Sequence, residues 1–401
     1  MERWSSNIFS RQFITRYALV LLSLLLLFGT SQAAFSNQAS NHADQKPVLK
    51  DGTSKWRIGY IETSKFANYA GTLYGIVKGL ESSGWIKTTK GLPFTQGSND
   101  SQAIWKWLSQ NATSDYIEFN QDAFYSISGD QAKKDAIKAR LAKQDLDLLI
   151  VMGTSAGKLV KNEKHSIPTL VFSSSNAKAS GIVNEIEKSG ISNVWAHMDP
   201  NRYKLQLRVF YDVFKFKKVG IVYEDSELGR IYSAIDDVKA VSKEKGFDVV
   251  EEHVIEPVDF AKDYEPYIQS LIQANTRLTK KVDAMYLPLG LWDSPDLPRI
   301  IKPFLDAKIP LFSQLGVEEV KMGVLISLAR PDFTGIGTFG ATKISDVFHA
   351  KLPGDLSQVY GDTPSIAINL AAAKKIGYKA PFDILISSDE IYTELVPVSG
   401  N

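Results

Sequence analysis

Short apolar runs alternate with longer amphipathic segments along most of the chain. The runs, roughly four to six residues long, predict strands, and the segments between them predict helices. In the first half the predicted strands are Ile58–Ile61, Tyr116–Phe119, Leu148–Met152 and Thr169–Phe172. The predicted helices there are Leu73–Ser83, Gln131–Lys143 and Ser155–Lys161. This alternation is typical of a parallel sheet with helices on both faces.

The strand signals recur in the second half of the chain in the same order. The matching segments are Ile58–Ser64 with Val219–Ser226, Asp147–Gly153 with Asp283–Gly290, and Ile167–Ser173 with Ile309–Ser313. Apolar strands resemble one another, but three similarities in one order are hard to dismiss. We therefore predict an α/β fold class with two Rossmann-like lobes, each containing a parallel sheet.

The spacing of the repeat predicts an insertion in the first lobe. Gly59 and Asp147 are 88 residues apart, whereas Gly220 and Asp283 are 63 residues apart. The surplus fits the segment Ile86–Asn111, which contains a short predicted helix of its own.

We expect the chain to cross between the lobes three times, near Ser175–Asn176, Leu325–Ile326 and Gly361. Lobe one then consists of residues 53–176 and 326–360, and lobe two of residues 177–325 and 361–395. Three crossings form a hinge that suits rigid-body closure.

The N-terminus has the features of a secretory signal. Three arginines precede the apolar run Tyr17–Phe28, and Ser31-Gln32-Ala33 offers small residues to a signal peptidase. A membrane anchor is the alternative, but twelve residues span only roughly 18 Å as a helix. We expect residues 1–33 to be a cleaved signal peptide, residues 34–52 a flexible leader, and the mature protein to be found in the periplasm.

Composition excludes several function classes. The chain has no cysteine, which removes disulfides, thiolate metal sites and cysteine nucleophiles. Its 46 basic and 45 acidic residues give no overall field for nucleic acid. The five histidines lack metal-ligand spacing. We expect no metal, no cofactor and no nucleic-acid partner.

Polar side chains follow the predicted strands of both lobes. In open parallel sheets ligands bind beyond the carboxyl ends of the strands. The candidate ligand-binding residues are Glu62, Thr63, Ser64, Thr154, Ser155, Ser173, Ser174, Ser175 and Asn176 in lobe one, and Tyr223, Glu224, Ser226, Trp292, Asp293 and Gln314 in lobe two. Hydroxyls at helix N-termini suit an anionic group, while carboxylates and aromatic rings suit a cationic or apolar group. The alternative interpretation is that many of these residues only cap helices.

Several segments carry a resemblance to a known family. They are Gly153–Ala156, Ile167–Phe172, Ser180–Val183, Lys218–Tyr223 and Ala367–Ala371. From Trp56 to about Glu394 the chain resembles periplasmic substrate-binding proteins of ABC transporters with the type I binding-protein fold, in a family associated with aromatic amino acids. It departs from that family's frequent acidic-proline turn at Ser174-Ser175-Asn176 and from its His-Pro at Glu62-Thr63-Ser64.

These observations predict a solute-binding protein, not an enzyme. It would capture a small molecule, such as an amino acid or a similar zwitterion or carboxylate, between its lobes and deliver it to the permease of an ABC importer. We expect it to be a monomer. A ligand-sensing module that reports to a receptor is one alternative. A serine hydrolase is another, because Gly153–Gly157 matches the G-x-S-x-G turn, but the oxyanion segment that this fold requires is missing from the sequence.

Overall fold

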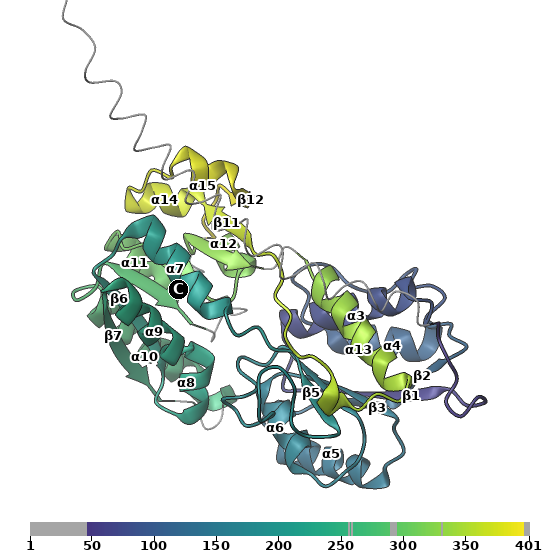
Figure 1. The fold of residues 1–401 in the computed structure, drawn as a ribbon. Coiled ribbons are helices and arrows are strands. Elements are labelled where there is room, and N and C mark those ends of the chain that lie inside the picture. Colours follow the sequence, from purple (N-terminus) through teal and green to yellow (C-terminus); the bar gives the residue numbers. More distant parts are fainter. Residues whose placement is uncertain (1–45, 256, 258–259, 289–294, 330–331, 397–401) are drawn as a thin grey trace, which may run out of the picture. The chain divides into compact units, whose positions relative to one another are not determined.

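The chain forms two α/β lobes, each built on its own sheet (Figure 1). The computed structural model describes residues 46–255, 257, 260–288, 295–329 and 332–396. The expected signal peptide, residues 1–33, and most of the expected leader lie outside these described residues. Among the described helices, none combines the length and apolar character needed to cross a membrane.

The first sheet has the strand order β2-β1-β3-β4-β5, and all its neighbouring strands are parallel. Its strands are β1 (Trp56–Glu62), β2 (Ile117–Ser126), β3 (Leu148–Met152), β4 (Thr169–Phe172) and β5 (Val194–Ala196). The helices of this lobe are α3 (Ala67–Ser82), α4 (Ser101–Asn111), α5 (Gln131–Lys143), α6 (Thr154–Asn162), α13 (Thr334–Phe348) and the 3-10 helix η1 (Pro353–Asp355). Strands β3 and β4 are buried along their whole length, as helix-covered strands must be.

The second sheet has the order β12-β11-β10-β9-β8-β6-β7. Its strands are β6 (Lys218–Glu224), β7 (Asp248–Val254), β8 (Ala284–Leu287), β9 (Leu311–Ser313), β10 (Ile326–Ala329), β11 (Ser365–Asn369) and β12 (Ser388–Tyr392). Only β10 and β11 pair antiparallel. The helices are α7 (Arg202–Phe214), α8 (Glu227–Ser233), α9 (Ile235–Lys245), α10 (Phe260–Leu278), α11 (Leu297–Asp306), α12 (Val317–Lys321), α14 (Leu370–Ile376) and α15 (Phe382–Ile386).

The two lobes share one plan, which confirms the predicted fold class. The order β2-β1-β3-β4-β5 in the first sheet corresponds to β7-β6-β8-β9-β10 in the second. The repeat extends to single residues, because Gly59 pairs with Leu149 and Gly220 with Met285 at equivalent positions of their sheets. The second sheet then continues into β11 and β12, which have no counterpart in the first.

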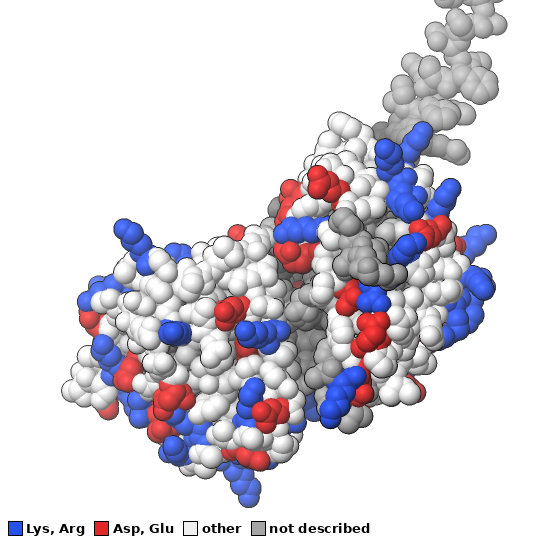
Figure 2. Space-filling view, turned by 180° about the vertical axis from the view of Figure 1, so that it is seen from behind, with Lys and Arg blue, Asp and Glu red and all other residues white. Residues whose placement is uncertain are grey.

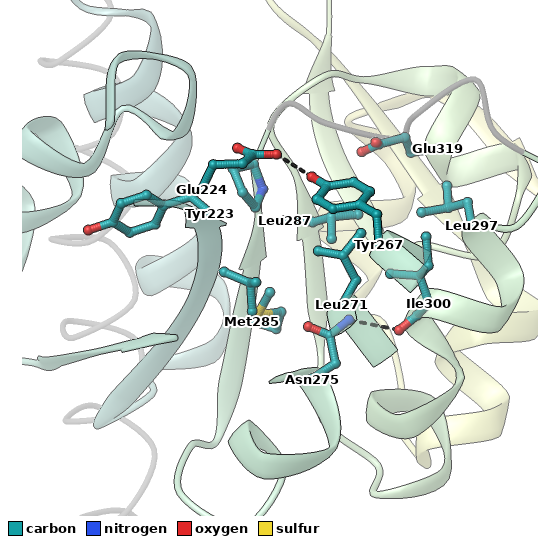
Figure 3. Close-up of a pocket in the computed structure, with 12 residues that line it drawn as sticks. Tyr223, Glu224, Tyr267, Leu271, Asn275, Met285, Leu287, Leu297, Ile300 and Glu319 are labelled. Atoms are coloured by element: carbon teal, nitrogen blue, oxygen red, sulfur yellow. Dashed lines mark hydrogen bonds between the residues drawn. The ribbon is translucent and has the colours of Figure 1, made fainter. Parts of the chain in front are cut away.

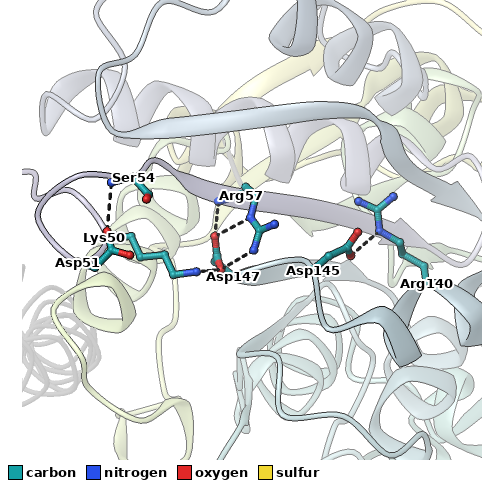
Figure 4. Close-up of polar contacts among 7 residues, drawn as sticks. All are labelled: Lys50, Asp51, Ser54, Arg57, Arg140, Asp145 and Asp147. Atoms are coloured by element: carbon teal, nitrogen blue, oxygen red, sulfur yellow. Dashed lines mark hydrogen bonds and ion pairs between the residues drawn. The ribbon is translucent and has the colours of Figure 1, made fainter.

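Two aspartates hold equivalent places at the starts of the two central strand pairs. Asp147 accepts a hydrogen bond from the backbone N–H of Arg57 at 2.9 Å, and Asp283 accepts one from that of Lys218 at 2.8 Å. Asp147 also binds the Lys50 ammonium at 2.7 Å and the Arg57 guanidinium at 3.2 Å (Figure 4). These interactions lower the pKa of the Asp147 carboxyl against the opposing effect of its burial. They also fix the described end of the expected leader to the first sheet.

The crossings between the lobes lie later in the chain than the sequence indicated. Strand β5 pairs with β4, so the chain remains in the first lobe past Ser175–Asn176 and crosses just before α7. Strand β10 pairs with β9, so Ile326–Ala329 belongs to the second lobe and the crossing falls between β10 and α13. The third crossing joins η1 to β11 and contains Gly361, as expected.

The first and third crossings are held side by side. The backbone N–H of Met198 donates to the carbonyl of Gln358 at 2.9 Å, and that of Tyr360 donates to the carbonyl of Met198 at 3.0 Å. Gln358 is fully buried, and the oxygen of its side-chain amide accepts the backbone N–H of Ala196 at 3.1 Å. These bonds join the two crossings into one connection between the lobes.

Glycines let α13 approach α3 closely and place an aromatic ring at the edge of the first lobe. A side chain at Gly75 would clash with the carbonyl of Phe333, and one at Gly337 would clash with the backbone of Gly75. A side chain at Gly71 would occupy the space of the Phe333 ring. The close packing of these two helices therefore sets the position of Phe333.

Candidate functional site

Hydroxyl groups tie the strand-end loops of the first lobe to one another. The Thr63 hydroxyl accepts the N–H of Ala156 at 3.1 Å, and the Thr154 hydroxyl accepts the N–H of Ser175 at 3.2 Å. The Ser173 hydroxyl lies 3.1 Å from that of Thr72. Thr63, Thr154 and Ser173 thus use hydrogen bonds to hold three loops together, and none of them is the N-cap of a helix.

Asn176 and Ser226 have similar local roles. The Asn176 side chain accepts the N–H of Ala179 at 3.0 Å within a turn. Ser226 is the N-cap of α8 and accepts the N–H of Gly229 at 3.0 Å. Both residues shape the loops in which the sequence placed them.

Ser155 and Gln314 meet through a tyrosine that the sequence analysis missed. The Ser155 hydroxyl, from the start of α6 in lobe one, lies 3.2 Å from the hydroxyl of Tyr232 in α8 of lobe two. The amide of Gln314, which is fully buried, donates to the carbonyl of Tyr232 at 2.9 Å. Two predicted residues from opposite lobes are therefore brought to one place.

Ser174 offers a hydrogen-bonding group at the same edge of the sheet. Its hydroxyl is buried and has no hydrogen-bond partner among the described residues. A buried hydroxyl without a partner costs free energy, so this group is suited to a ligand or a bound water. Ser64 lies half-buried in the loop that follows β1.

Glu62, the last residue of β1, is buried within the first lobe. It is 1% exposed and accepts a hydrogen bond from the Tyr60 hydroxyl at 3.0 Å. Burial raises the pKa of its carboxyl above the ordinary value. The structure thus encloses this carboxyl within the first lobe, at the end of β1.

The carboxylates and rings predicted in lobe two lie mainly inside that lobe. Tyr223 is buried, donates to the carboxylate of Glu251 and contacts the His253 ring edge-on at 4.7 Å. Glu224 accepts a hydrogen bond from Tyr267 beside a small internal cavity of about 40 Å³ (Figure 3). Trp292 and Asp293 lie outside the described residues.

That cavity also borders a buried carboxyl, Glu319 of α12. Glu319 is 1% exposed and accepts the Ser313 hydroxyl at 2.5 Å. Burial raises the pKa of its carboxyl to about 8. The cavity has room for about three water molecules and is too small for an amino acid.

A larger pocket, of about 390 Å³, is lined by residues from both lobes. This volume falls in the range of small-molecule sites. Its walls combine aromatic, amide and charged side chains. The lining residues include Phe66, Asn68, Gln96, Ser98, Asn99 and Phe333 from lobe one, and Arg202, Leu315, Glu318 and Met322 from lobe two.

None of the candidate residues predicted from the sequence lines this pocket, although several of its lining residues are close neighbours of predicted ones. Phe66 and Asn68 lie just beyond the predicted loop Glu62–Ser64, and Leu315 follows Gln314. Gln96–Asn99 belongs to the predicted insertion, which approaches lobe two at Gly97, where a Cβ would lie 3.3 Å from the Glu318 carboxyl. The role of Arg202 could not be predicted from the sequence, because a single arginine at the start of a helix belongs to no recognisable motif.

The histidines of the described residues are engaged away from Ser155. Ring nitrogens of His165, His197 and His349 lie 3.1, 2.8 and 2.7 Å from the backbone carbonyls of Val160, Tyr360 and Ser345. His253 packs against Tyr223. The Ser155 hydroxyl, which a hydrolase would use as the nucleophile, instead lies beside Tyr232.

Neither metal ligation nor a one-sided charge field marks the described surface. No group of three or more His, Asp or Glu side chains in the described ranges could hold a metal ion. Acidic and basic side chains are interspersed over the face drawn in Figure 2. On that face, the described residues form no extended basic patch of the kind that binds nucleic acid.

Comparison with known proteins gives a consistent result. A family model described as ABC transporter substrate binding protein matches residues 110–392. An ABC domain in complex with L-Trp from Streptococcus pneumonia is 19% identical, with 83% of this chain and 99% of that chain covered and a TM-score of 0.61. A conserved domain protein from Vibrio cholerae is 18% identical, with coverages of 84% and 100% and a TM-score of 0.62.

A ligand-free, open substrate-binding protein with adhesive properties from Clostridium difficile is also similar. It is 21% identical, with coverages of 84% and 100% and a TM-score of 0.58. No curated protein matches the chain. At these identities the structural similarities establish a shared fold.

Proposed function

Because the chain belongs to the family of ABC transporter substrate-binding proteins, we propose that it captures a small zwitterion or carboxylate, such as an amino acid, between its lobes and presents it to the permease of an importer. The observation that carries this proposal is the pocket of about 390 Å³, which both lobes line with aromatic and polar side chains. The similar protein bound to L-Trp supports an aromatic amino acid as the first ligand to test.

Such a protein performs no chemistry, and its work is a change of conformation. Ligand contacts from both lobes favour the closed arrangement, because a ligand shifts an equilibrium by its differential affinity for the two states. The three crossings between the lobes would absorb the backbone change. A permease that recognises the closed state would then receive loaded protein in preference to empty protein.

Binding is tested by calorimetric titration with the amino acids, beginning with tryptophan, phenylalanine and leucine, and with glucose as a sugar. From the strand-end prediction, Ser155→Ala should weaken binding by on the order of 1.5–3 kcal/mol. Ser155 does not line the pocket of about 390 Å³, so unchanged affinity would favour that pocket over the strand ends as the binding site. Ser109→Ala is the matched control, since the Ser109 hydroxyl is half-buried on α4 and donates to the carbonyl of Lys106 within its own helix. Binding of sugars alone would refute the amino-acid assignment.

The hydrolase alternative is tested with the same variant. We expect no ester turnover that depends on Ser155. Turnover that disappears in Ser155→Ala, together with unchanged ligand affinity, would favour the enzyme instead.

Export is the second part of the proposal. We propose that residues 1–33 are removed and that the mature protein works in the periplasm as a monomer. Mass spectrometry of the exported protein should find an N-terminus near Ala34, and an intact Met1 would contradict cleavage.

A further inference from the structure

Arg202 stands apart from the other arginines that the structure describes. In each of the other six, the guanidinium lies within 4.0 Å of a carboxylate oxygen. These six are Arg57, Arg140, Arg208, Arg230, Arg277 and Arg299. Arg202 makes no ion pair and no side-chain hydrogen bond with any residue in the described ranges, and its guanidinium lies over the ring of Tyr203, at 5.4 Å. A guanidinium offers five N–H donors in a planar fork that fits a carboxylate.

The position of Arg202 allows its guanidinium to donate hydrogen bonds to a ligand in the pocket. Arg202 is half-buried at the start of α7, and its side chain lines the pocket between the lobes. Its neighbour one turn along, Gln206, is fixed by bonds to the carbonyls of Gln314 and Leu328 at 3.0 and 3.2 Å, so this end of the helix is held firmly under the pocket. A positioned, partly desolvated guanidinium binds an anion more strongly than one in water.

The facing wall of the pocket comes from the first lobe. Asn99, in the Ile86–Asn111 insertion, carries an amide that can donate to a carboxylate. Phe66 and Phe333 add aromatic surface to the same pocket. Glu318, the acidic residue of the lining, already binds the Lys321 ammonium at 2.9 Å. The pocket therefore combines a guanidinium that can bind an anionic group with aromatic surface that can contact an apolar group.

We propose that Arg202 binds the carboxylate of the captured solute and that the insertion, through Asn99, forms the wall of the pocket that faces it. This inference rests on the proposed solute-binding function and deepens it by naming the charged group that is recognised. It assigns the anionic end of the ligand to lobe two. Among the lobe-one hydroxyls that the sequence favoured for that end, Thr154 already accepts a backbone N–H and Ser155 contacts the Tyr232 hydroxyl.

The test compares acids with their neutral amides. Wild type, Arg202→Gln and Arg208→Gln are titrated by calorimetry with tryptophan, phenylalanine and leucine, and with the C-terminal amide of each. Arg208 lies on the same helix and pairs with Glu244 on the surface, so its variant is the matched control. Wild type and Arg208→Gln should prefer the acid over the amide by on the order of 10- to 100-fold, the range of a charged hydrogen bond. Arg202→Gln should lose that preference through weaker binding of the acid.

The outcomes separate the two proposals. If Arg202→Gln binds the acids as wild type does, the carboxylate seat is wrong and the solute-binding function stands. If wild type binds none of the six probes at millimolar concentration, both are overturned. Asn99→Ala should weaken the acids several-fold and retain the preference over the amides, and unchanged affinity would exclude the insertion from the site. Matching thermal unfolding of all variants shows that each is folded.

Discussion

Replacing the buried carboxyl of Glu319 with an amide should stabilise the protein at neutral pH. The carboxyl is 1% exposed and accepts the Ser313 hydroxyl at 2.5 Å, and no basic side chain of the described residues forms an ion pair with it. Glu319→Gln keeps a carbonyl oxygen that can accept this bond. It also preserves the chain of bonds through Ser313, whose hydroxyl accepts the N–H of Gly316 at 2.8 Å.

The magnitude follows from proton linkage. The pKa of Glu319 rises from 4.5 in the unfolded chain to about 8 in the folded protein. Below pH 4.5 both states hold the proton, and the carboxyl makes no difference to the pH dependence. Between pH 4.5 and 8 the folded state holds one more proton than the unfolded state, so the free energy of unfolding falls by about 1.4 kcal/mol per pH unit. At pH 7 the accumulated loss is roughly 3 kcal/mol, and the variant does not suffer it.

The assay is urea denaturation of both proteins, followed by tryptophan fluorescence, at several values between pH 4 and pH 8. The comparison at pH 4 is the internal control, because both side chains are then uncharged. The stability of Glu319→Gln relative to wild type should increase steadily above about pH 5. A difference that stays constant to pH 8 would show that the folded carboxyl ionises like an exposed one, and would refute the reasoning.

Two further substitutions test the ties that build the first lobe. Gly153→Ala should destabilise the protein by roughly 2–4 kcal/mol, because Gly153 has φ of 91° and a Cβ there would clash with the Tyr69 hydroxyl; the urea midpoint measures it, and an unchanged midpoint would contradict the crowding. Asp147→Asn should cost about 1–3 kcal/mol at pH 7 by removing the charge that binds Lys50 and Arg57. Since the folded pKa of Asp147 lies below its unfolded value of 3.8, this stability is present above pH 3.8 and is lost as the pH falls through the folded pKa, so the two denaturation curves should converge in acid.

The sequence predicted the interior of the fold better than its edges. Strands β3 and β4 and helix α5 have the predicted bounds. An unbroken apolar run identifies each strand, and a run of charged helix-forming residues that begins after the N-cap Asp130 identifies the helix. Strand β5 was missed because three residues cannot display a period, and the lobe boundary was misplaced with it. Strand β10 was assigned to the wrong side of a crossing, since an apolar run does not tell which sheet it joins.

The sequence pointed to the strand ends near the pocket, but it predicted none of the residues that line the pocket. Rules of sheet topology located the strand ends, and Ser155 and Gln314 do meet there through Tyr232. These rules could not distinguish a strand-end residue that points outward from one that is enclosed. Glu62 and Tyr223 were therefore predicted as ligand-binding residues although both are buried inside their lobes. Arg202 lies on a helix outside the strand-end loops, and only the folded chain brings it to the pocket.

Some polar groups near the pocket form hydrogen bonds within the protein, and others have no partner among the described residues. Thr63 and Thr154 bond backbone N–H groups, so replacing them would loosen the loops before it affected any ligand. The buried hydroxyl of Ser174 and the guanidinium of Arg202 have no hydrogen-bonding partner among the described residues. A polar group that is desolvated without a partner lowers stability, and a ligand that bonds it recovers that loss as affinity. Recognition by this protein should therefore depend most on the groups that its own structure does not satisfy, and these are the groups that a sequence motif is least able to reveal.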